Sequence, residues 1–455
     1  MTISRKKRQL FIAGIDILVL IMSVYLALVI RWLNIPSLHD FFVHLHVMLP
    51  VLIGWILCFY TLGLYSLEMP YTGYKAIWLI FFVTVICALI GFTIYYLNYQ
   101  SQIVPKTILA LFSFLAFTLI SLWRWLFNLI SRKLFSGVNI VFIGINNTVT
   151  DLLNHINDFS YMVYNIPFIF DDTYEGEDYR GIPVLKEKDL FIGEIKKNNI
   201  RAVVLAHDKN ISYILQDTLF ELLHSHVYFF NIADFYETYM RRIPIDAVNE
   251  LWFLRRIDLS IKSFYQYIKR IVDIVMALLM FIVTLPFMPL IILIIKMESP
   301  GPAFFRQKRV GLFAREFFII KFRTMRTADN SHEPTVKDDA RITKSGRFFR
   351  RTRIDEIPQC INVLKGDMSF IGPRPERPEL VCELEKEVPF YRQRLLVKPG
   401  LSGWDQVSGE YHSPSREDTR KKLQYDLYYI KNMSLFLDIS IFFKTIMTVF
   451  RRAGV

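Results

Sequence analysis

Two adjacent acidic residues, Asp355 and Glu356, follow a cluster of arginines and are the residues of this chain best suited to chemistry. Pro358 comes soon after them, and proline is favoured at the first position of a helix because its missing N–H is not needed there. The acids would then lie at a helix N-terminus, where N–H groups and the helix dipole attract anions. This pattern predicts a phosphate site with a divalent cation. A capped surface helix is the alternative, because Thr352-x-x-Asp355 also fits a capping box.

Basic residues are concentrated around the acid pair. Residues 301–360 contain fourteen Lys and Arg against seven Asp and Glu. The cations that could hold a phosphate are Lys321, Arg323, Arg350, Arg353 and Arg374, the last of them between Pro373 and Pro375. Lys321 and Arg323 alternate with apolar residues in a predicted strand, so both should project from one face. Contacts with lipid headgroups are the alternative role for Arg350 and Arg353.

The composition indicates a membrane protein with anionic partners. Of its 455 residues, 53% are hydrophobic and 15% aromatic, and the net charge is +12. Lipid headgroups, nucleic acids and phosphorylated substrates would all suit that charge. We exclude nucleic acid because the cations cluster beside an acid pair and apolar segments. The four cysteines have neither metal-ligand spacing nor a disulfide pattern, which fits a reducing setting.

Four apolar segments in the first third of the chain predict transmembrane helices. They cover about 10–30, 47–67, 76–97 and 107–123. The basic N-terminus and the cluster of Arg124, Arg132 and Lys133 both predict a cytoplasmic location, with four crossings between them. Asp16 lies inside the first segment and should face a neighbouring helix, since a charge facing lipid is unfavourable. We therefore predict a four-helix bundle over residues 1–133.

The next segment, 134–250, has the alternation of strands and helices of a small Rossmann-like α/β module. Strands are predicted at 138–144, 167–170, 182–185, 202–206 and 227–231, with a helix near 148–158. The first turn contains Gly144 but lacks the other glycines of the dinucleotide fingerprint. A structural or regulatory module is therefore favoured over a nucleotide-binding one.

A fifth apolar run, 274–295, contains Pro286 and Pro289 near its middle. Interior proline kinks or breaks a helix, and basic residues flank both ends, so neither end is favoured for the outside. A re-entrant helix over about 270–296, which enters the membrane and returns to the cytoplasmic face, satisfies both observations. The alternative is a kinked spanning helix, which would place the acid pair across the membrane from cytosolic substrates.

Two further features lie in the last part of the chain. Residues 398–409 form a glycine-punctuated loop that contains Gln406, and residues 435–450 are apolar with interspersed charges. The second segment fits an amphipathic helix on the membrane surface or a helix packed in the soluble core, and its pattern does not decide between them.

Many motifs follow one another in the second half of the chain. They are Lys269-Arg270-x-x-Asp273, Pro286-x-x-Pro289, Ser299-Pro-Gly-Pro302, Lys321-Phe-Arg-Thr-Met325, Arg353-Ile-Asp355-Glu356, Asn362-Val-Leu-Lys-Gly-Asp-Met-Ser369, Gly372-Pro-Arg-Pro375 and Lys398-Pro-Gly-Leu-Ser-Gly-Trp404. With these motifs in this order, the second half resembles the catalytic domain of bacterial polyprenyl-phosphate hexose-1-phosphate transferases, the monotopic phosphoglycosyl transferases. The whole chain is similar to the long form of the family. Asp405 departs from its pattern beside Gln406 and could affect the choice of sugar.

The resemblance implies a mainly helical catalytic domain over 251–455, with small β elements. It implies transfer of a sugar phosphate from a UDP-sugar to undecaprenyl phosphate with Mg²⁺, for capsule, exopolysaccharide or O-antigen assembly. Asp355 would be the nucleophile and a metal ligand, with Glu356 as its partner base or second metal contact. The cations named above, Pro373, Pro375 and Gln406 would bind substrate. The family also implies a homodimer in the bacterial inner membrane with its active site on the cytoplasmic face.

Two other function classes compete with this interpretation. A membrane-anchored nucleotide-sugar dehydratase or epimerase needs a full glycine fingerprint and a Tyr-x-x-x-Lys pair. Tyr265 and Lys269 have that spacing, but they lead into the apolar run without such a fingerprint. A non-enzymatic scaffold for polysaccharide assembly would not need adjacent acids at an arginine-rich helix start.

Overall fold

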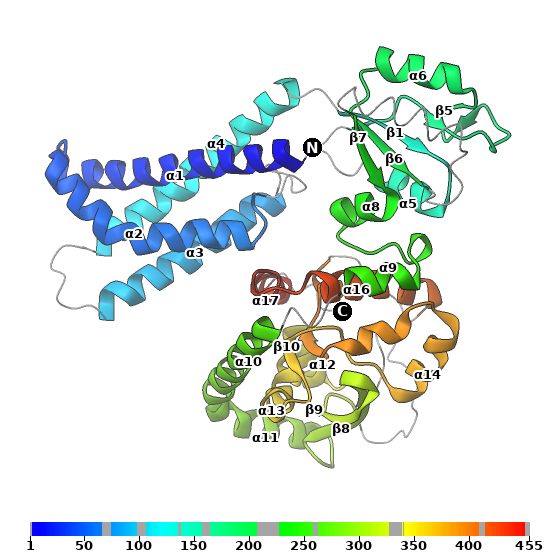
Figure 1. The fold of residues 1–455 in the computed structure, drawn as a ribbon. Helices are drawn as coiled ribbons and strands as arrows, with labels where there is room; N and C mark the ends of the chain where they lie inside the picture. The colour runs from blue at the N-terminus through cyan, green and yellow to red at the C-terminus, as the bar shows by residue number, and fades with distance from the viewer. Residues whose placement is uncertain are drawn as a thin grey trace. The chain divides into compact units, whose positions relative to one another are not determined.

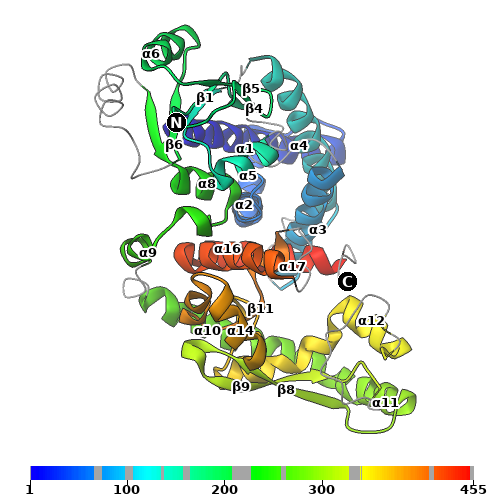
Figure 2. The ribbon, with the colours of Figure 1, turned by 90° about the vertical axis from the view of Figure 1, so that its right-hand side faces the viewer.

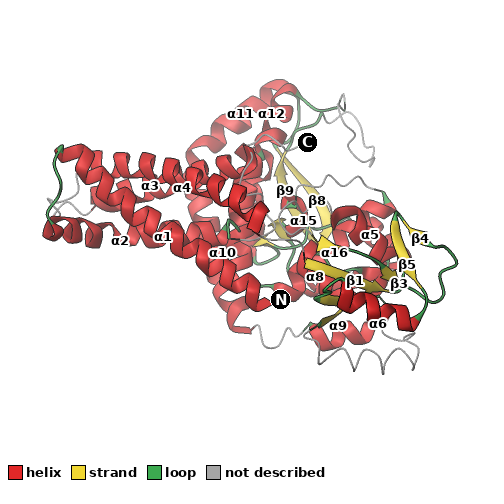
Figure 3. Cartoon of the chain, turned by 90° about the horizontal axis from the view of Figure 1, so that it is seen from above, coloured by secondary structure: helices red, strands yellow, loops and turns green. Residues whose placement is uncertain are grey.

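A computed structural model describes residues 2–65, 74–97, 106–134, 138–156, 164–206, 227–257, 263–326, 339, 341–408 and 415–450. The chain divides into two compact units, Met1–Phe235 and Tyr236–Val455. Helices predominate in the described residues (Figure 3). The finer division into three domains remains a prediction.

Four long apolar helices open the first unit (Figure 1). They are α1 (Thr2–Trp32), α2 (Leu38–Thr61), α3 (Tyr74–Leu97) and α4 (Lys106–Leu134). Segments of α1, α2 and α4 are long and apolar enough to cross a membrane, and the apolar part of α3 covers Ile77–Thr93. The four predicted helices are confirmed, but α2 begins nine residues before the predicted 47. Ser37 caps it there by accepting a hydrogen bond from the N–H of Asp40.

A buried ion pair joins two of these helices. The Arg124 guanidinium on α4 contacts the Asp16 carboxylate on α1 at 2.5 Å, and it also donates to the carbonyl of Leu64 at 2.7 Å. Asp16 therefore faces a neighbouring helix, as predicted. The Arg124 side chain is buried inside the helix packing and neutralised there, and the cytoplasmic location of its basic cluster remains a prediction.

The α/β part of the first unit contains a mostly parallel sheet in the order β4-β5-β3-β1-β6-β7, with β2 paired to β1. Its elements are β1 (Val138–Ile143), α5 (Asn147–Ile156), β2 (Tyr164–Asn165), β3 (Ile169–Phe170), β4 (Asp178–Tyr179), β5 (Ile182–Leu185), α6 (Lys188–Lys197), β6 (Ala202–Leu205) and β7 (Tyr228–Asn231). Among the described strands of this sheet, only β4 and β5 pair antiparallel. Each predicted strand of this segment is present, and the central strand β1 has four buried residues because the sheet is covered on both faces.

The second unit holds the acid pair. After α8 (Ile232–Met240), η2 (Ile245–Ala247) and α9 (Glu250–Arg256) come α10 (Ser263–Thr284), η3 (Leu285–Phe287), α11 (Met288–Glu298), β8 (Phe304–Val310), η4 (Leu312–Ala314), β9 (Glu316–Phe322), α12 (Lys344–Thr352), η5 (Ile354–Gln359) and α13 (Cys360–Lys365). Then follow β10 (Ser369–Ile371), α14 (Pro378–Glu387), η6 (Tyr391–Leu396), β11 (Gly400–Ser402), α15 (Trp404–Val407), α16 (Arg416–Asn432) and α17 (Leu435–Phe450). Figure 2 shows α16 and α17 on the opposite side of this unit from the β8–β9 hairpin. The hairpin contains the strand predicted around Lys321.

The predicted break in the fifth apolar run is present. One 3-10 turn at Pro286 separates α10 from α11, and Pro289 lies in the first turn of α11. One face of α10 packs on α13 and β9 through Ala277, and one face of α11 packs through Ile291 and Ile295. Many of the other large apolar side chains of both helices are exposed, among them Leu279, Ile282 and Leu290, as a lipid-facing surface requires.

The last helix, α17, packs into the core of its unit through Leu437 and Ile441. Its Asp438 accepts hydrogen bonds from Tyr265, Lys269 and Tyr429. Of the two alternatives for this segment, the structure therefore supports the packed helix. Tyr265 and Lys269 both bind Asp438, and this shared partner explains their spacing without a dehydratase or epimerase site.

Candidate functional site

The acid pair lies in the first turn of the 3-10 helix η5 and not at the start of an α-helix. Arg353 precedes it with a left-handed backbone (φ 54°) that ends α12 and redirects the chain. Pro358 lies inside η5, and α13 begins only at Cys360. The predicted helix start at Pro358 is thus two residues early for an α-helix. The capping-box alternative is wrong, because Thr352 is still part of α12 and donates back to the carbonyl of Phe348.

Three cations converge on Glu356. Its Oε1 accepts from the Lys321 ammonium at 2.8 Å and the Arg374 guanidinium at 3.1 Å, and its Oε2 lies 3.5 Å from Arg353. Burial opposes ionisation of this carboxyl group, which is 7% exposed, but Arg374, Lys321 and Arg353 together lower its pKa well below the usual range. Glu356 is therefore an ionised carboxylate whose charge is neutralised by three cations. These come from β9 (Lys321), the end of α12 (Arg353) and the segment after β10 (Arg374).

The carboxylate of Asp355 has different surroundings, although Asp355 is adjacent to Glu356 in the sequence and similarly buried, at 8% exposed. Among the described residues, its carboxylate has no hydrogen bond or ion pair to a side chain within 4 Å. Burial first, and the charge of Glu356 second, raise the pKa of Asp355 to about 6, while Lys321, Arg350 and Arg374 act in the opposite direction. The site thus holds one neutralised acid and one free acid at the centre of a positive field.

Two of the predicted cations have other partners. Arg350 on α12 donates to the Thr324 hydroxyl at 2.9 Å and still acts electrostatically on Asp355. Arg323 is buried and donates to the carbonyls of Ser299 and Pro300 at 2.6 and 2.7 Å. Lys321 and Arg323 therefore serve different partners, and Arg323 holds the chain at the end of α11 to the strand that carries Lys321.

Arg374 is the exposed residue of a buried segment, Gly372–Pro375. Its side chain is 44% exposed, whereas the glycine and both flanking prolines are buried. The segment passes so close to β11 that a Cβ on Gly372 would lie 2.4 Å from the carbonyl oxygen of Lys398. Side chains are therefore excluded at Gly372, and the close contact fixes the backbone from which Arg374 reaches Glu356.

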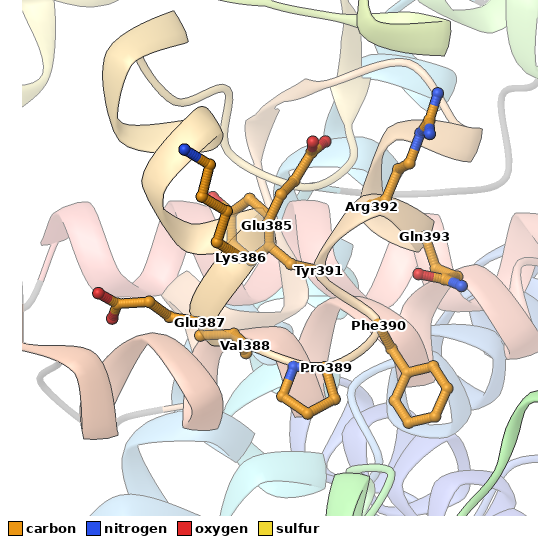
Figure 4. Close-up of a pocket in the computed structure, with 9 residues that line it drawn as sticks. All are labelled: Glu385, Lys386, Glu387, Val388, Pro389, Phe390, Tyr391, Arg392 and Gln393. Carbon is orange, nitrogen blue, oxygen red and sulfur yellow. The ribbon is translucent and has the colours of Figure 1, made fainter.

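The other predicted site residues lie elsewhere in the second unit. Gln406 is in α15, and among the described residues its buried carboxamide oxygen has no hydrogen-bond partner. Pro286 and Pro289 lie at the break between α10 and α11. A surface hollow of about 220 Å³ between α14 and η6 is lined by residues Glu385 to Gln393, which include neither the acid pair nor its cations (Figure 4).

The donor set limits which metal the site could hold. In the described part of the chain, no group of three or more His, Cys, Asp or Glu side chains is arranged for a metal ion. A structural metal site is thus not supported. Mg²⁺ does not need three protein ligands, because it binds through one or two carboxylates and takes its other ligands from phosphates and water. The free oxygens of Asp355 fit that requirement, while those of Glu356 are already shared by cations.

Several residues that support the site could not be recognised from the sequence. Asn362 on α13 donates to the carbonyl of Phe318 at 2.7 Å and accepts from the N–H of Ile320, which fastens α13 to β9. Arg270 on α10 donates to the C-terminal carbonyls of α13 at Val363 and Leu364. The family motifs include both residues, but only the fold shows that they bind backbone.

Known proteins resemble this chain over its second half and beyond. A model of the bacterial sugar transferase family matches residues 264–452. The UDP-N-acetylgalactosamine-undecaprenyl-phosphate N-acetylgalactosaminephosphotransferase of Aeromonas hydrophila is 43% identical over 232 residues, which are 50% of this chain and 54% of the relative. The UDP-glucose:undecaprenyl-phosphate glucose-1-phosphate transferase of Xanthomonas campestris pv. campestris is 33% identical over 326 residues, 68% of this chain and 66% of the relative.

A shorter relative is matched over almost its whole length. The exopolysaccharide production protein PSS of Rhizobium leguminosarum bv. phaseoli is 39% identical over 192 residues, which are 41% of this chain and 96% of that protein. The chain spans only 54% and 66% of the two longer relatives.

Proposed function

Because the chain belongs to the bacterial sugar transferase family, we propose that it transfers a sugar 1-phosphate from a UDP-sugar to undecaprenyl phosphate and releases UMP. The observation that carries this proposal is the unequal acid pair: Glu356 bound by three cations beside a free, buried Asp355. Carboxylates act as nucleophiles towards phosphoryl groups. The named relatives use substrates of this class.

The proposed reaction has two steps at the same phosphorus. An oxygen of Asp355 attacks the phosphate that carries the sugar, the bond to the bridging oxygen breaks, and UMP leaves with that oxygen. An oxygen of undecaprenyl phosphate then attacks the phosphosugar on Asp355, which returns the free carboxylate and forms the lipid diphosphate sugar. Lys321, Arg353 and Arg374 stand where they can offset the charge of the two phosphates.

In this proposal, Asp355 and the substrate phosphates would hold Mg²⁺. When bound, it would neutralise charge on the diphosphate and on the leaving UMP. Glu356 contributes by fixing Lys321 and Arg374 near the same phosphates rather than by an unshared oxygen.

We also propose that α10 and α11 form a re-entrant hairpin that enters the membrane from the cytoplasmic side. Both ends of the pair are attached to the polar part of the same unit. Near the start of α10, Tyr265 and Lys269 donate to Asp438 on α17, and at the end of α11, Glu298 accepts from the N–H groups of Lys344 and Ser345. A helix that crossed the bilayer would separate its ends by about 30 Å of hydrocarbon, and the two attachments would not lie on one unit.

Labelling of engineered cysteines tests this geometry. In a chain with its four native cysteines replaced, we expect Tyr267→Cys and Met297→Cys, both at exposed positions, to react with a membrane-impermeant maleimide only from the cytoplasmic side. Ile35→Cys, in the exposed turn after α1, is the matched control and should react from the outside. Reaction of Tyr267→Cys and Met297→Cys from opposite sides would contradict the hairpin.

Activity should depend on pH through Asp355. The pKa of its carboxyl group is raised to about 6, and only the ionised form can attack phosphorus. We therefore expect kcat/KM to increase about tenfold per pH unit below the pKa and to level off above it. Glu356 has a pKa far lower and stays ionised throughout. Rates measured between about pH 5 and about pH 8 check this, and a flat profile would exclude Asp355 as the titrating nucleophile.

A panel of UDP-sugars tests the proposed function directly. Membranes that contain the full chain are incubated with undecaprenyl phosphate, Mg²⁺ and UDP-N-acetylgalactosamine, UDP-glucose or UDP-galactose, and UMP release is followed. We expect one of these sugars to give lipid-dependent UMP release that chelation abolishes. Lipid-independent hydrolysis, or no UMP with any UDP-sugar, would refute the proposal.

A further inference from the structure

The segment that carries Arg374 is held by its carbonyl groups. Pro373 and Pro375 have no N–H, so this stretch cannot form an ordinary ladder. Instead, four consecutive carbonyls each accept a hydrogen bond. The donors are the N–H of Gly400 to Pro373, the guanidinium of Arg394 to Arg374, the guanidinium of Arg309 to Pro375, and the N–H of Val310 to Glu376. Two of the four donors are thus side chains, which a mutation can remove.

Arg394 is the side-chain donor that contacts Arg374 itself. It lies in η6, is 7% exposed, and donates from Nη2 to the Arg374 carbonyl at 2.9 Å. The same guanidinium pairs with Asp426 on α16 at 2.9 Å and donates to the hydroxyl of Tyr391 at 2.6 Å. Three acceptors in different directions therefore fix the buried guanidinium of Arg394. A lysine ammonium could not make the same set of hydrogen bonds, because it is a single flexible donor centre and not a planar fork.

The helix behind the segment makes a second contact of the same kind. Tyr429 lies three residues after Asp426, on the same face of α16; its hydroxyl shares one proton between Asp438 at 2.8 Å and the carbonyl of Ile371 at 3.2 Å. Through Arg394 and Tyr429, α16 holds the chain on both sides of Gly372–Pro373. Among the described residues, this segment links α16 to the acid pair, because its Arg374 side chain contacts Glu356.

We propose that Arg394, fixed by Asp426, is a positioning residue: it sets the direction of the Arg374 guanidinium and thereby the affinity of the site for the diphosphate of the nucleotide sugar. This inference rests on the proposed function, because it takes the diphosphate as the ligand of Arg374. Arg394 itself is buried and touches no substrate.

The test is a double-mutant cycle on the full chain in membranes. Arg394→Lys keeps the charge opposite Asp426 but loses the fork. We expect KM for the UDP-sugar to increase about tenfold with kcat changed less than about threefold. In an Arg374→Ala background, Arg394→Lys should have almost no further effect, because the group that it positions is gone.

Lys431→Met is the matched control. Lys431 lies on α16, the helix that carries Asp426, and pairs with Glu237 instead of contacting the Gly372–Pro375 segment. It should lower the melting temperature without changing KM. Equal, additive effects of Arg394→Lys in both backgrounds would show a purely structural role and overturn the inference. Absence of UMP release from the unmutated chain would instead overturn the proposed function, so the two failures are distinguishable.

Discussion

Asp355→Asn should reduce UMP release to the background rate while the protein remains folded. Asparagine has the same shape, so the packing of η5 is preserved, but its amide cannot form the phosphosugar ester and is a poor ligand for Mg²⁺. Loss of a covalent nucleophile typically costs a factor of 10⁴ or more, on the order of that seen when an enzyme's nucleophile is removed. A radiolabelled sugar phosphate should be trapped on the unmutated protein in the absence of the lipid acceptor, and not on the variant.

The stability of this variant gives an independent check. Because the folded state raises the pKa of Asp355 from 3.8 to about 6, the ionised carboxylate is unfavourable above pH 6, and folding loses stability as pH increases from the unfolded to the folded pKa. The neutral Asn variant should therefore be as stable as the unmutated chain or more stable at neutral pH, by about 1 to 3 kcal/mol. Glu383→Gln, at an exposed site on α14, is the control that should change neither property. An active or a destabilised Asp355→Asn protein would contradict the nucleophile assignment.

The sequence predicts those parts of the fold whose signal is local. Alternating side chains identify the strand β9, apolar runs identify the four helices, and prolines locate the break at Pro286. The boundaries depend on contacts that a local pattern does not contain. The start of α2 is set by Ser37, and the helix expected at Pro358 is displaced because Arg353 adopts a left-handed conformation.

The candidate site shows the same division. Asp355, Glu356, Lys321, Arg353 and Arg374 were all predicted from their types and spacing, and the structure brings these five together. Their unequal roles could not be predicted, because adjacent acids in a sequence are chemically equivalent until the fold assigns cations to one of them. The residues that support the site, such as Arg394 and Asp426, could not be predicted from the sequence either.

Distance along the chain explains why the roles of these supporting residues could not be predicted from the sequence. Arg394 and Asp426 are 20 and 52 residues from Arg374 along the chain; Arg394 donates to its backbone carbonyl, and Asp426 holds Arg394. A carbonyl acceptor has no residue identity, so no motif records such a contact. Asn362 and Arg270 escape recognition for the same reason.

Glu356→Gln should have the opposite effect on stability from Asp355→Asn. The ionised Glu356 has a pKa well below its unfolded value, so it stabilises the fold at neutral pH and loses that contribution only in strong acid. Glutamine leaves Lys321, Arg353 and Arg374 around a neutral group, and removal of one partner from a buried ion pair typically costs about 3 to 5 kcal/mol. We expect a clear decrease in melting temperature, and a decrease in kcat of about a hundredfold because Lys321 and Arg374 lose their anchor.

The pH profile of this variant separates electrostatics from simple loss of structure. Glu356 raises the pKa of Asp355 by its charge, so its neutralisation should move the acidic limb of kcat/KM to lower pH. Glu237→Gln removes another buried acid of the same unit, one that pairs with Lys431 and accepts from Asn432. That control should also lower the melting temperature, but it should leave the acidic limb in place. If both variants leave the acidic limb of kcat/KM in place, the ionisation of Asp355 does not depend on Glu356. If only Glu356→Gln shifts the limb, Glu356 sets the pKa of Asp355 and also holds the cations that the site requires.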